Sequence, residues 1–261
     1  MFWTRFASAV IAIGLALISI ALGGAWLMVA LGILMYLGLK EYFVMVEAEG
    51  YLPSRRLSTT LALSLLVVQQ FFPRFVEGGF LLAGSLIFCY LLFRPTAART
   101  ADIATSLLGL FYAGVFPSYW LRLRGLEGGD KFMLLTFLCI WAADIGAYVV
   151  GKSFGKLSLY PRVSPKKTLE GAVFGIVAST GVGMIGGGLL AWDLGLGFLF
   201  GLLVGGTALL GDLIESLMKR SARLKDSGNI IPGHGGILDR CDSYIFTAPL
   251  AFYFILLAFG S

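Results

Sequence analysis

Acidic and basic side chains share one face of a long apolar segment near the C-terminus. The spacing i, i+3, i+4 and i+7 is that of one helix face, and it is occupied by Asp212, Glu215, Ser216 and Lys219. Ionised carboxylates are costly inside a membrane and usually mark an ion or substrate site. We therefore predict a helix face with two carboxylates and a cation, extended by Arg220. A transport helix could show the same face, so this pattern alone leaves the chemistry open.

A glycine-rich loop follows this segment and surrounds the single histidine of the chain, His234. Gly233, Gly235 and Gly236 have no side chains, so backbone N–H groups in the loop could approach an anion closely. An ordinary turn between helices would explain these glycines equally well. The charged residues beside the loop must decide between the two interpretations.

Four acids fall at the ends of two neighbouring predicted helices, because Asp239 and Asp242 enter the last helix at i and i+3. With Asp212 and Glu215 they can hold hard divalent cations through oxygen. Phosphates can be held by the cations around them, which are Lys219, Arg220, Lys225 and Arg240. Carboxylates, Mg²⁺ and cations together predict chemistry at a phosphate. Asp144, in another apolar segment, is a further candidate ligand or orienting group.

A second basic loop begins at Lys152 and Lys156. These two lysines could simply follow the enrichment of cations in cytoplasmic loops, or they could contact anionic lipid headgroups. Lys166 and Lys167 lie against a defined helix start, because Pro165 should break any helix. We expect this second pair to contact an anionic group such as a phosphate. The loop is not a Walker loop, and no Rossmann fingerprint precedes it.

Long apolar blocks must position these groups. Of the 261 residues, 58% are hydrophobic and 13% are charged, whereas about a quarter of a soluble domain is charged. With roughly 20 residues per spanning helix, about nine helices fit. The sequence predicts an all-α integral membrane protein, a polytopic bundle with spans at 6–22, 25–46, 57–72, 79–93, 101–121, 132–150, 171–192, 194–218 and 244–260. The third and fourth spans are short and could form a re-entrant hairpin.

The short connections leave no room for a separate soluble domain, so residues 1–261 are predicted to form a single membrane domain. Residues 1–130 would be scaffold helices that could also form dimer contacts. Residues 131–261 would be the catalytic helices and their cytoplasmic loops. The three cysteines have no paired spacing, which predicts packing roles and neither a zinc site nor a disulfide framework for Cys89, Cys139 and Cys241.

The basic residues indicate which side of the membrane each loop faces. With nine spans, the side that holds the C-terminus carries 15 of the 20 cations, and the other side carries Arg5, Arg74, Arg122, Arg124 and Lys131. Cytoplasmic loops are enriched in Lys and Arg, so the C-terminus and both late basic loops should face the cytoplasm. Ten of the fifteen lie in those two loops, and without them the sides are equal. Short loops and the lack of a targeting segment favour a bacterial inner (plasma) membrane.

The run from Ser216 to Asp242 resembles the signature of the phosphatidate cytidylyltransferases (CDP-diacylglycerol synthases). The matching positions are Ser216, Met218, Lys219, Arg220, Lys225, Asp226, Gly228, Ile231, Pro232, His234, Gly235, Gly236, Ile237, Asp239, Arg240 and Asp242. Cys241 departs from the pattern, since the family usually has an aliphatic, aromatic or Thr residue there. The stretches 164–171 and 144–148 look like two further family motifs. The first 130 residues agree only in being polytopic and apolar.

This resemblance implies a bundle of about nine helices, a homodimer, and a Mg²⁺-dependent site that faces the cytoplasm. It implies cytidylyl transfer from CTP to phosphatidic acid, with CDP-diacylglycerol and pyrophosphate as products. By match to the motif, Asp212 and Asp239 would be metal ligands, in a centre that could include K⁺, with Glu215, Asp242 and Asp144 near. The expected partners are CTP, phosphatidic acid and membrane lipids, and no nucleic acid is expected.

The resemblance also suggests roles for single side chains. Lys219, Arg220 and Lys225 would hold the triphosphate, and Asp212, Asp239 and His234 would complete the catalytic set. Further substrate contacts are expected from Lys166, Lys167, Gly235, Gly236 and Arg240. His234 could position a phosphate or the loop, act as an acid or base, or be structural. The lipid phosphate is already anionic, so a strong general base is not required.

Two other classes of protein explain part of the pattern. A cation-coupled transporter would explain acids in apolar segments, but it does not need the charged glycine-rich loop. A CTP-dependent polyprenol kinase would transfer the γ-phosphoryl group to an alcohol and release CDP in place of pyrophosphate. A CDP-alcohol phosphotransferase is less well supported, because its spaced Asp-Gly, Ala-Arg and Asp pattern is absent from the sequence.

Overall fold

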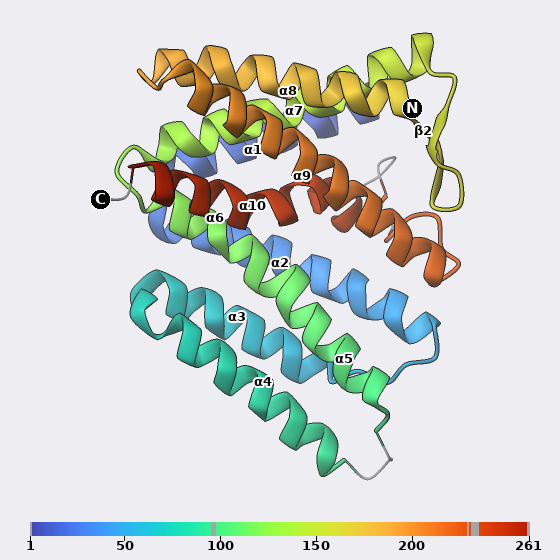
Figure 1. Cartoon of the computed structure of the whole chain (residues 1–261). Coiled ribbons are helices and arrows are strands. Elements are labelled where there is room, and N and C mark those ends of the chain that lie inside the picture. The colour runs from blue at the N-terminus through green and yellow to red at the C-terminus, as the bar shows by residue number, and fades with distance from the viewer. Residues whose placement is uncertain (1, 95–97, 229, 231–234, 260–261) are drawn as a thin grey trace.

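Helices make up nearly the whole chain (Figure 1). The computed structural model describes residues 2–94, 98–228, 230 and 235–259. Its α-helices are α1 (Phe2–Leu22), α2 (Gly24–Ala48), α3 (Arg55–Phe71), α4 (Val76–Leu92), α5 (Thr100–Gly109), α6 (Phe116–Arg124), α7 (Gly129–Phe154), α8 (Leu169–Leu189), α9 (Leu194–Ser221) and α10 (Leu238–Phe259). A 3₁₀ turn, η1 (Pro73–Phe75), precedes α4, and a π-helical segment, η2 (Leu110–Val115), joins α5 to α6.

Each of the nine predicted spans coincides with helical structure, so the prediction of an all-α membrane bundle is confirmed. Within the described residues, seven helical stretches are long and apolar enough to cross a membrane. The remaining two are α1, whose shorter apolar stretch is Val10–Leu22, and α3, which has 17 residues. The predicted count of nine is therefore approximate.

Two local features were not predicted. The span expected at 101–121 is one long helical run that contains η2, where the turns are wider than in an α-helix. The second basic loop contains a small antiparallel hairpin of β1 (Ser158–Tyr160) and β2 (Ser164–Thr168). Pro165 does interrupt the helices as expected, and α8 begins directly after the hairpin.

Side-chain caps define where two helices of the C-terminal half begin. The Thr168 side chain accepts a hydrogen bond from the Gly171 N–H at 3.2 Å at the start of α8. Asp193 does the same for the Gly195 N–H at 2.7 Å at the start of α9. Such caps satisfy N–H groups that the first helical turn leaves without partners.

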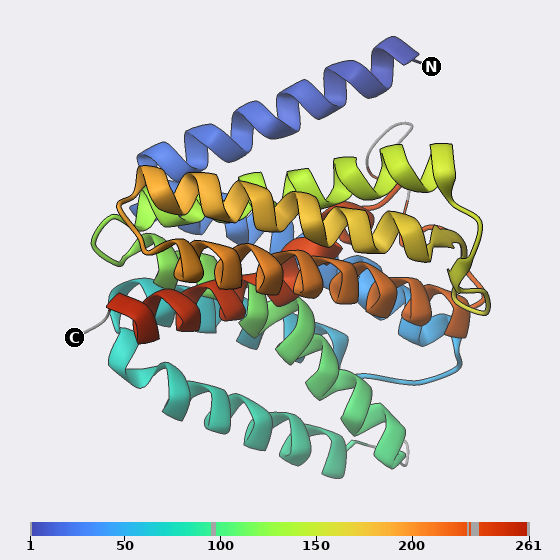
Figure 2. The same cartoon turned by 45° about the horizontal axis from the view of Figure 1, so that its top comes forward.

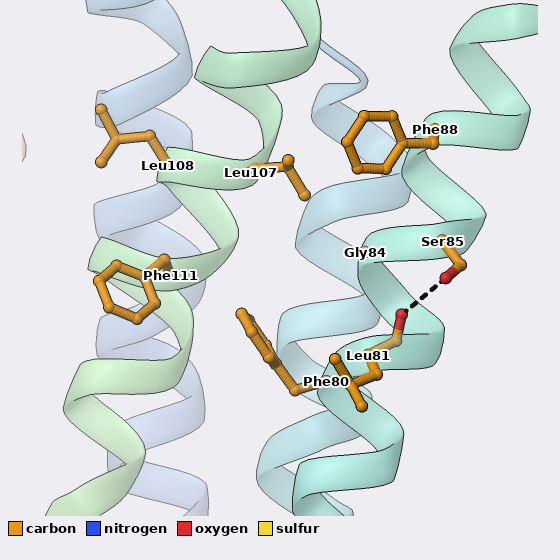
Figure 3. Close-up of a pocket in the computed structure, with 8 residues that line it drawn as sticks. All are labelled: Phe80, Leu81, Gly84, Ser85, Phe88, Leu107, Leu108 and Phe111. Atoms are coloured by element: carbon orange, nitrogen blue, oxygen red, sulfur yellow. Dashed lines mark hydrogen bonds between the residues drawn. The ribbon is translucent and has the colours of Figure 1, made fainter.

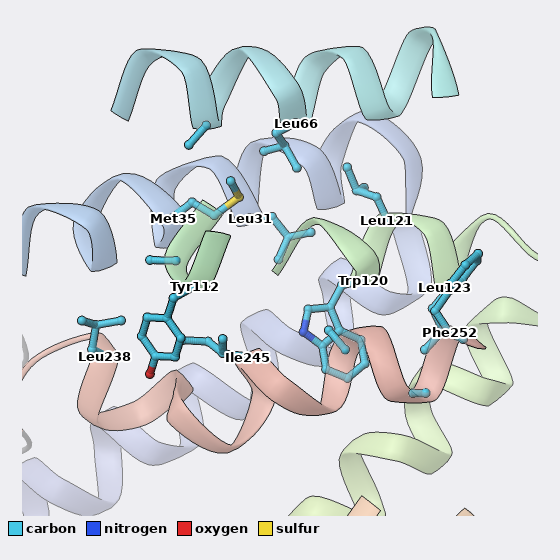
Figure 4. Packing of buried hydrophobic residues seen from close by; sticks show 14 of the residues in the cluster. Leu31, Met35, Leu66, Tyr112, Trp120, Leu121, Leu123, Leu238, Ile245 and Phe252 are labelled. Carbon is cyan, nitrogen blue, oxygen red and sulfur yellow. The ribbon is translucent and has the colours of Figure 1, made fainter. Parts of the chain in front are cut away.

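The helices pack as a layered bundle around α6 and α10. In Figure 1, α7, α8 and α9 form one side and α3 and α4 the other, and Figure 2 shows α1 along the outside. The buried cluster in Figure 4 joins α2, α3, η2, α6 and α10 through Met35, Leu66, Tyr112, Trp120 and Ile245. The long helical run of α5, η2 and α6 therefore fixes α10 against the N-terminal helices.

Glycine lets α8 and α9 approach very closely. A Cβ atom added to Gly183 would lie 2.6 Å from the carbonyl oxygen of Gly197 and 2.6 Å from the Cα of Gly201. The Ser179 hydroxyl also donates to the Gly201 carbonyl at 2.8 Å. Small residues at helix contacts are a usual means of packing in membranes, where hydrocarbon offers no hydrophobic drive between helices. This contact fixes the axis of α9, which carries the predicted acidic face.

We predict that Gly183→Ala lowers the free energy of unfolding by about 1–3 kcal/mol, because its methyl group would press on rigid backbone. Gly181→Ala is the matched control, since a Cβ there meets nothing within 4 Å. It should be neutral or slightly stabilising, because alanine favours helices. Thermal unfolding in detergent measures both. Equal stability of the two variants would contradict the proposed close contact.

Candidate functional site

The predicted site residues gather at one end of the bundle. The last turns of α9, the first turn of α10, the β1–β2 hairpin and the end of α7 all lie there (Figure 1). Asp212, Glu215 and Lys219 come from α9, and Asp239 and Asp242 come from α10. The structure thus brings together the two acidic pairs that the spacing placed on neighbouring helices.

Lys219 lies between two carboxylates. Its Nζ is 2.5 Å from Glu215 Oε2 and 2.6 Å from Asp239 Oδ1. Glu215 is 0% exposed, and Lys219 and Asp239 are also largely shielded from solvent. A buried carboxylate needs such a partner, because desolvation makes an unpaired charge very costly. The lysine therefore connects α9 to the first turn of α10.

Asp239 is the most heavily bonded acid of the cluster. Beyond Lys219, its Oδ2 accepts hydrogen bonds from the Ser227 N–H at 2.9 Å and the Gly236 N–H at 2.8 Å. The Ser227 hydroxyl also lies 3.0 Å from the same oxygen. Asp239 thereby holds the glycine-rich loop against α10, and the Gly236 N–H is engaged within the protein.

A second group of charges joins α9 to the hairpin. Lys167, on β2, forms an ion pair with Asp212. Asp242 lies within hydrogen-bonding reach of Asp212 and interacts electrostatically with Glu215. Asp144 on α7 is close enough to interact with Asp212 and Lys167. Asp144, Asp212, Asp242 and Lys167 therefore interact where α7, α9, α10 and the hairpin meet.

The other predicted cations lie around this group. The Arg220 Nε donates to the Val163 carbonyl at 3.1 Å, so this residue ties the hairpin to α9. Lys166 and Lys225 are exposed, as is Arg240, which interacts with Asp144. His234 lies outside the described residues.

The donor set suits a hard divalent cation. The interaction of the Asp212 and Asp242 carboxylates favours a cation shared between them. Glu215 Oε1 and the hydroxyl of nearby Tyr112 have no hydrogen-bond partner among the described residues, whereas Glu215 Oε2 is paired with Lys219. Within the same part of the chain, no three His, Cys, Asp or Glu side chains converge as a complete metal site. Mg²⁺ does not need one, since it commonly takes one or two carboxylates together with water and substrate phosphates.

Gly235 shows why the loop needs glycine. Its φ is +84°, a conformation that side chains disfavour. A Cβ there would also lie 2.7 Å from Asp239 Oδ2. The glycine therefore lets the backbone pass directly beside the carboxylate.

Sequence reasoning missed Glu41. This residue of α2 is 4% exposed, and it accepts hydrogen bonds from the backbone N–H groups of Ile237 and Leu238 at 3.0 and 2.9 Å. It lies inside the predicted span 25–46, so the rule that singled out Asp144 could have found it.

An apolar groove lies elsewhere in the described structure. It has a volume of about 490 Å³ and lies between α4 and the α5–η2 run (Figure 3). Its lining is apolar apart from Ser85, whose hydroxyl donates to the Leu81 carbonyl at 3.0 Å. Without an ionisable group, this groove offers no chemistry at a phosphate.

Comparison with known proteins shows which family the chain belongs to. Residues 3–258 match the model of the cytidylyltransferase family. This chain belongs to that family. It is 47% identical to a phosphatidate cytidylyltransferase of Synechocystis sp., over 97% of this chain and 96% of the relative.

Two other phosphatidate cytidylyltransferases extend the similarity. An Arabidopsis thaliana chloroplastic protein is 35% identical over 94% of this chain and 71% of the relative. A Staphylococcus epidermidis protein is 33% identical over 94% and 96%. The resemblance drawn from residues 216–242 is thereby confirmed, and it extends to the N-terminal helices that supply Glu41.

For this cytidylyltransferase-family chain we predict that Lys219→Met lowers the free energy of unfolding by about 3 kcal/mol, because two shielded carboxylates lose their shared cation. Adding Glu215→Gln should recover part of the loss, since Asp239 keeps its backbone donors. Melting temperatures in detergent measure both variants. A single variant as stable as the wild type would show that the Lys219 bridge does not hold α9 to α10.

Proposed function

We propose that this membrane enzyme transfers the cytidylyl group of CTP to phosphatidic acid, forming CDP-diacylglycerol and releasing pyrophosphate. The supporting observation is a cluster of carboxylates and cations in a chain that is 47% identical, over nearly its full length, to a phosphatidate cytidylyltransferase. Chemistry at a phosphate requires groups of these types.

The position of the cluster suits a reaction between a soluble nucleotide and a membrane lipid. Asp212 lies in the last third of α9, and Asp239 and Asp242 lie at the start of α10. Helix ends at the boundary of the bilayer are open to water on one side and to headgroups on the other. Asp212, whose side chain is 34% exposed, can be reached by both substrates, whereas Asp242 and Glu215 are buried behind it.

The reaction is an in-line displacement at phosphorus. A phosphate oxygen of phosphatidic acid attacks the α-phosphorus of CTP, and a new P–O bond forms. The bond from that phosphorus to the oxygen bridging to the β-phosphorus breaks, and pyrophosphate leaves with the electron pair. The nucleophile is already anionic, so the protein's main tasks are to gather the anions and to orient them.

The cations divide into two sets by their surroundings. Lys166 and Lys225 are exposed and can turn toward phosphates. Lys167 carries an ion pair with Asp212 and is placed to bring one phosphate to the acids. Lys219 is enclosed by Glu215 and Asp239, so we assign it the positioning of Asp239 and not the triphosphate contact expected from the sequence.

Mg²⁺ would be held by Asp212 and Asp242, with Asp144 and Glu215 beside them. The family resemblance also gives Asp239 as a ligand of the ion. Its Oδ2 already accepts hydrogen bonds from two backbone N–H groups, so the ion would have to share that oxygen with them. When bound, the ion would neutralise phosphate charge and stabilise the leaving pyrophosphate. A K⁺ ion in the same centre stays a prediction of the resemblance.

The reaction can be tested together with its sidedness. Sealed inverted membrane vesicles that contain the protein receive phosphatidic acid, Mg²⁺ and CTP labelled at the α-phosphorus. We expect label in a lipid, one pyrophosphate per lipid, and no reaction in sealed right-side-out vesicles until they are permeabilised. Label that stays in soluble CDP would indicate a kinase and contradict the proposal. Activity in intact right-side-out vesicles would place the site on the opposite face.

We predict that Asp212→Asn lowers turnover by about 100-fold or more, because the group of acids loses the charge that faces Lys167. Asp130→Asn is the matched control. This exposed residue lies in the first turn of α7, at the opposite end of α7 from the site. Both variants should unfold at the wild-type temperature, and turnover should be measured across a Mg²⁺ titration. An Asp212→Asn enzyme with near-wild-type turnover would remove this residue from the site.

The expected homodimer also stays a prediction. Residues 1–130 were predicted to supply dimer contacts in addition to scaffold. The mass of the purified protein in detergent, measured by light scattering, would decide between one copy and two.

A further inference from the structure

Glu41 occupies a position that the reaction chemistry alone does not explain. It belongs to α2, yet its carboxylate reaches the start of α10. Ile237, which it contacts there, lies 196 residues further along the chain. Oε1 accepts from the Ile237 N–H at 3.0 Å, and Oε2 accepts from the Leu238 N–H at 2.9 Å. The first N–H groups of a helix have no partner within the helix, and a negative charge there is favoured by the helix dipole.

A third hydrogen bond leads from Glu41 toward Asp239. The Ser227 hydroxyl lies 3.0 Å from Glu41 Oε2 and 3.0 Å from Asp239 Oδ2. It also accepts from the Asp239 N–H at 3.3 Å. The hydroxyl has one proton, so it can donate to only one carboxylate at a time. Ser227 therefore connects Glu41 directly to the acid that binds Lys219.

The loop backbone is shaped to admit the Glu41 carboxylate. A Cβ on Gly228 would lie 2.5 Å from Glu41 Oε1, and one on Gly236 would lie 2.5 Å from Oε2. Two glycines at opposite ends of the loop thus enclose one side chain. Three hydrogen bonds and the start of α10 compensate for the burial of the Glu41 carboxylate.

We propose that Glu41 is a positioning residue for the transfer reaction, which holds the loop that ends at Gly236 and, through Ser227, orients Asp239 and Lys219. The expected effect on catalysis rests on the proposed function. The expected effect on the loop and the start of α10 does not. Residues that orient metal ligands, as Glu41 would orient Asp239, commonly change metal affinity or activity by about 10–100-fold when replaced.

The test compares Glu41→Gln with Glu47→Gln, which removes the same charge from an exposed site on the same helix. The amide of Gln turns an N–H₂ group toward a backbone donor or Ser227, so Glu41→Gln loses at least one hydrogen bond. We expect kcat to fall about 10-fold or more and the KM for CTP to rise. Partial unfolding would lower kcat and leave KM unchanged. Glu47→Gln should match the wild type.

Hydrogen exchange gives a readout that does not depend on activity. In Glu41→Gln the peptides that cover residues 235–243 should exchange faster than in the wild type, and in Glu47→Gln they should not. If the wild type makes no CDP-diacylglycerol, the proposed function fails, but the exchange result still tests the placement of the loop. Unchanged exchange and unchanged kinetics in Glu41→Gln would overturn the inference.

Ser227→Ala supplies a second variant in case Glu41→Gln does not fold. It removes only the connecting hydroxyl, and we expect a severalfold lower kcat with a small decrease in melting temperature, because a buried acceptor loses its donor. In the double variant the two losses should not multiply, because both act through Asp239. A Ser227→Ala enzyme with wild-type kcat, or losses that multiply, would overturn the inference.

Discussion

The bridge from Lys219 to Glu215 and Asp239 is the interaction on which the rest of the site depends. A cation shielded from water needs its carboxylates, and a carboxylate as buried as Glu215 needs its cation, so neither helix can shift without leaving a charge unpaired. The bridge fixes the end of α9 to the start of α10. Asp212 and Asp242 can then approach each other only because their helices are held in this register.

Around this bridge, three contacts between structural elements each position one charged side chain. The close glycine contact of α8 with α9 sets the axis on which Asp212 lies, and the β1–β2 hairpin brings Lys167 to it. The α5–η2–α6 run presses α10 against α2, which brings Glu41 to the loop. The N-terminal helices therefore do more than enclose the catalytic half, since one of them supplies a carboxylate to it.

Local spacing was enough to predict much of this arrangement. Helix periodicity placed Asp212, Glu215 and Lys219 on one face, and the apolar blocks predicted the helices, because both depend only on neighbouring residues. Glu41 could have been noted as an acid inside an apolar span, but its partners could not be predicted, because they lie 186 and 196 residues away in the sequence. Lys219 was expected to hold the triphosphate, but it is paired with acids. This pairing likewise depends on how α10 packs against α9, which local spacing does not predict.

The central claim is that CTP reacts at the carboxylate cluster where α9, α10 and the hairpin meet. The most direct measurement is an experimental structure of the wild-type protein with Mg²⁺ and a CTP analogue that cannot transfer its α-phosphoryl group. We predict density for the ion between Asp212 and Asp242 and density for the phosphates beside Lys167. Lys219 should still be held by Glu215 and Asp239. Nucleotide density in the apolar groove beside α4, or at the opposite end of the bundle, would contradict the account.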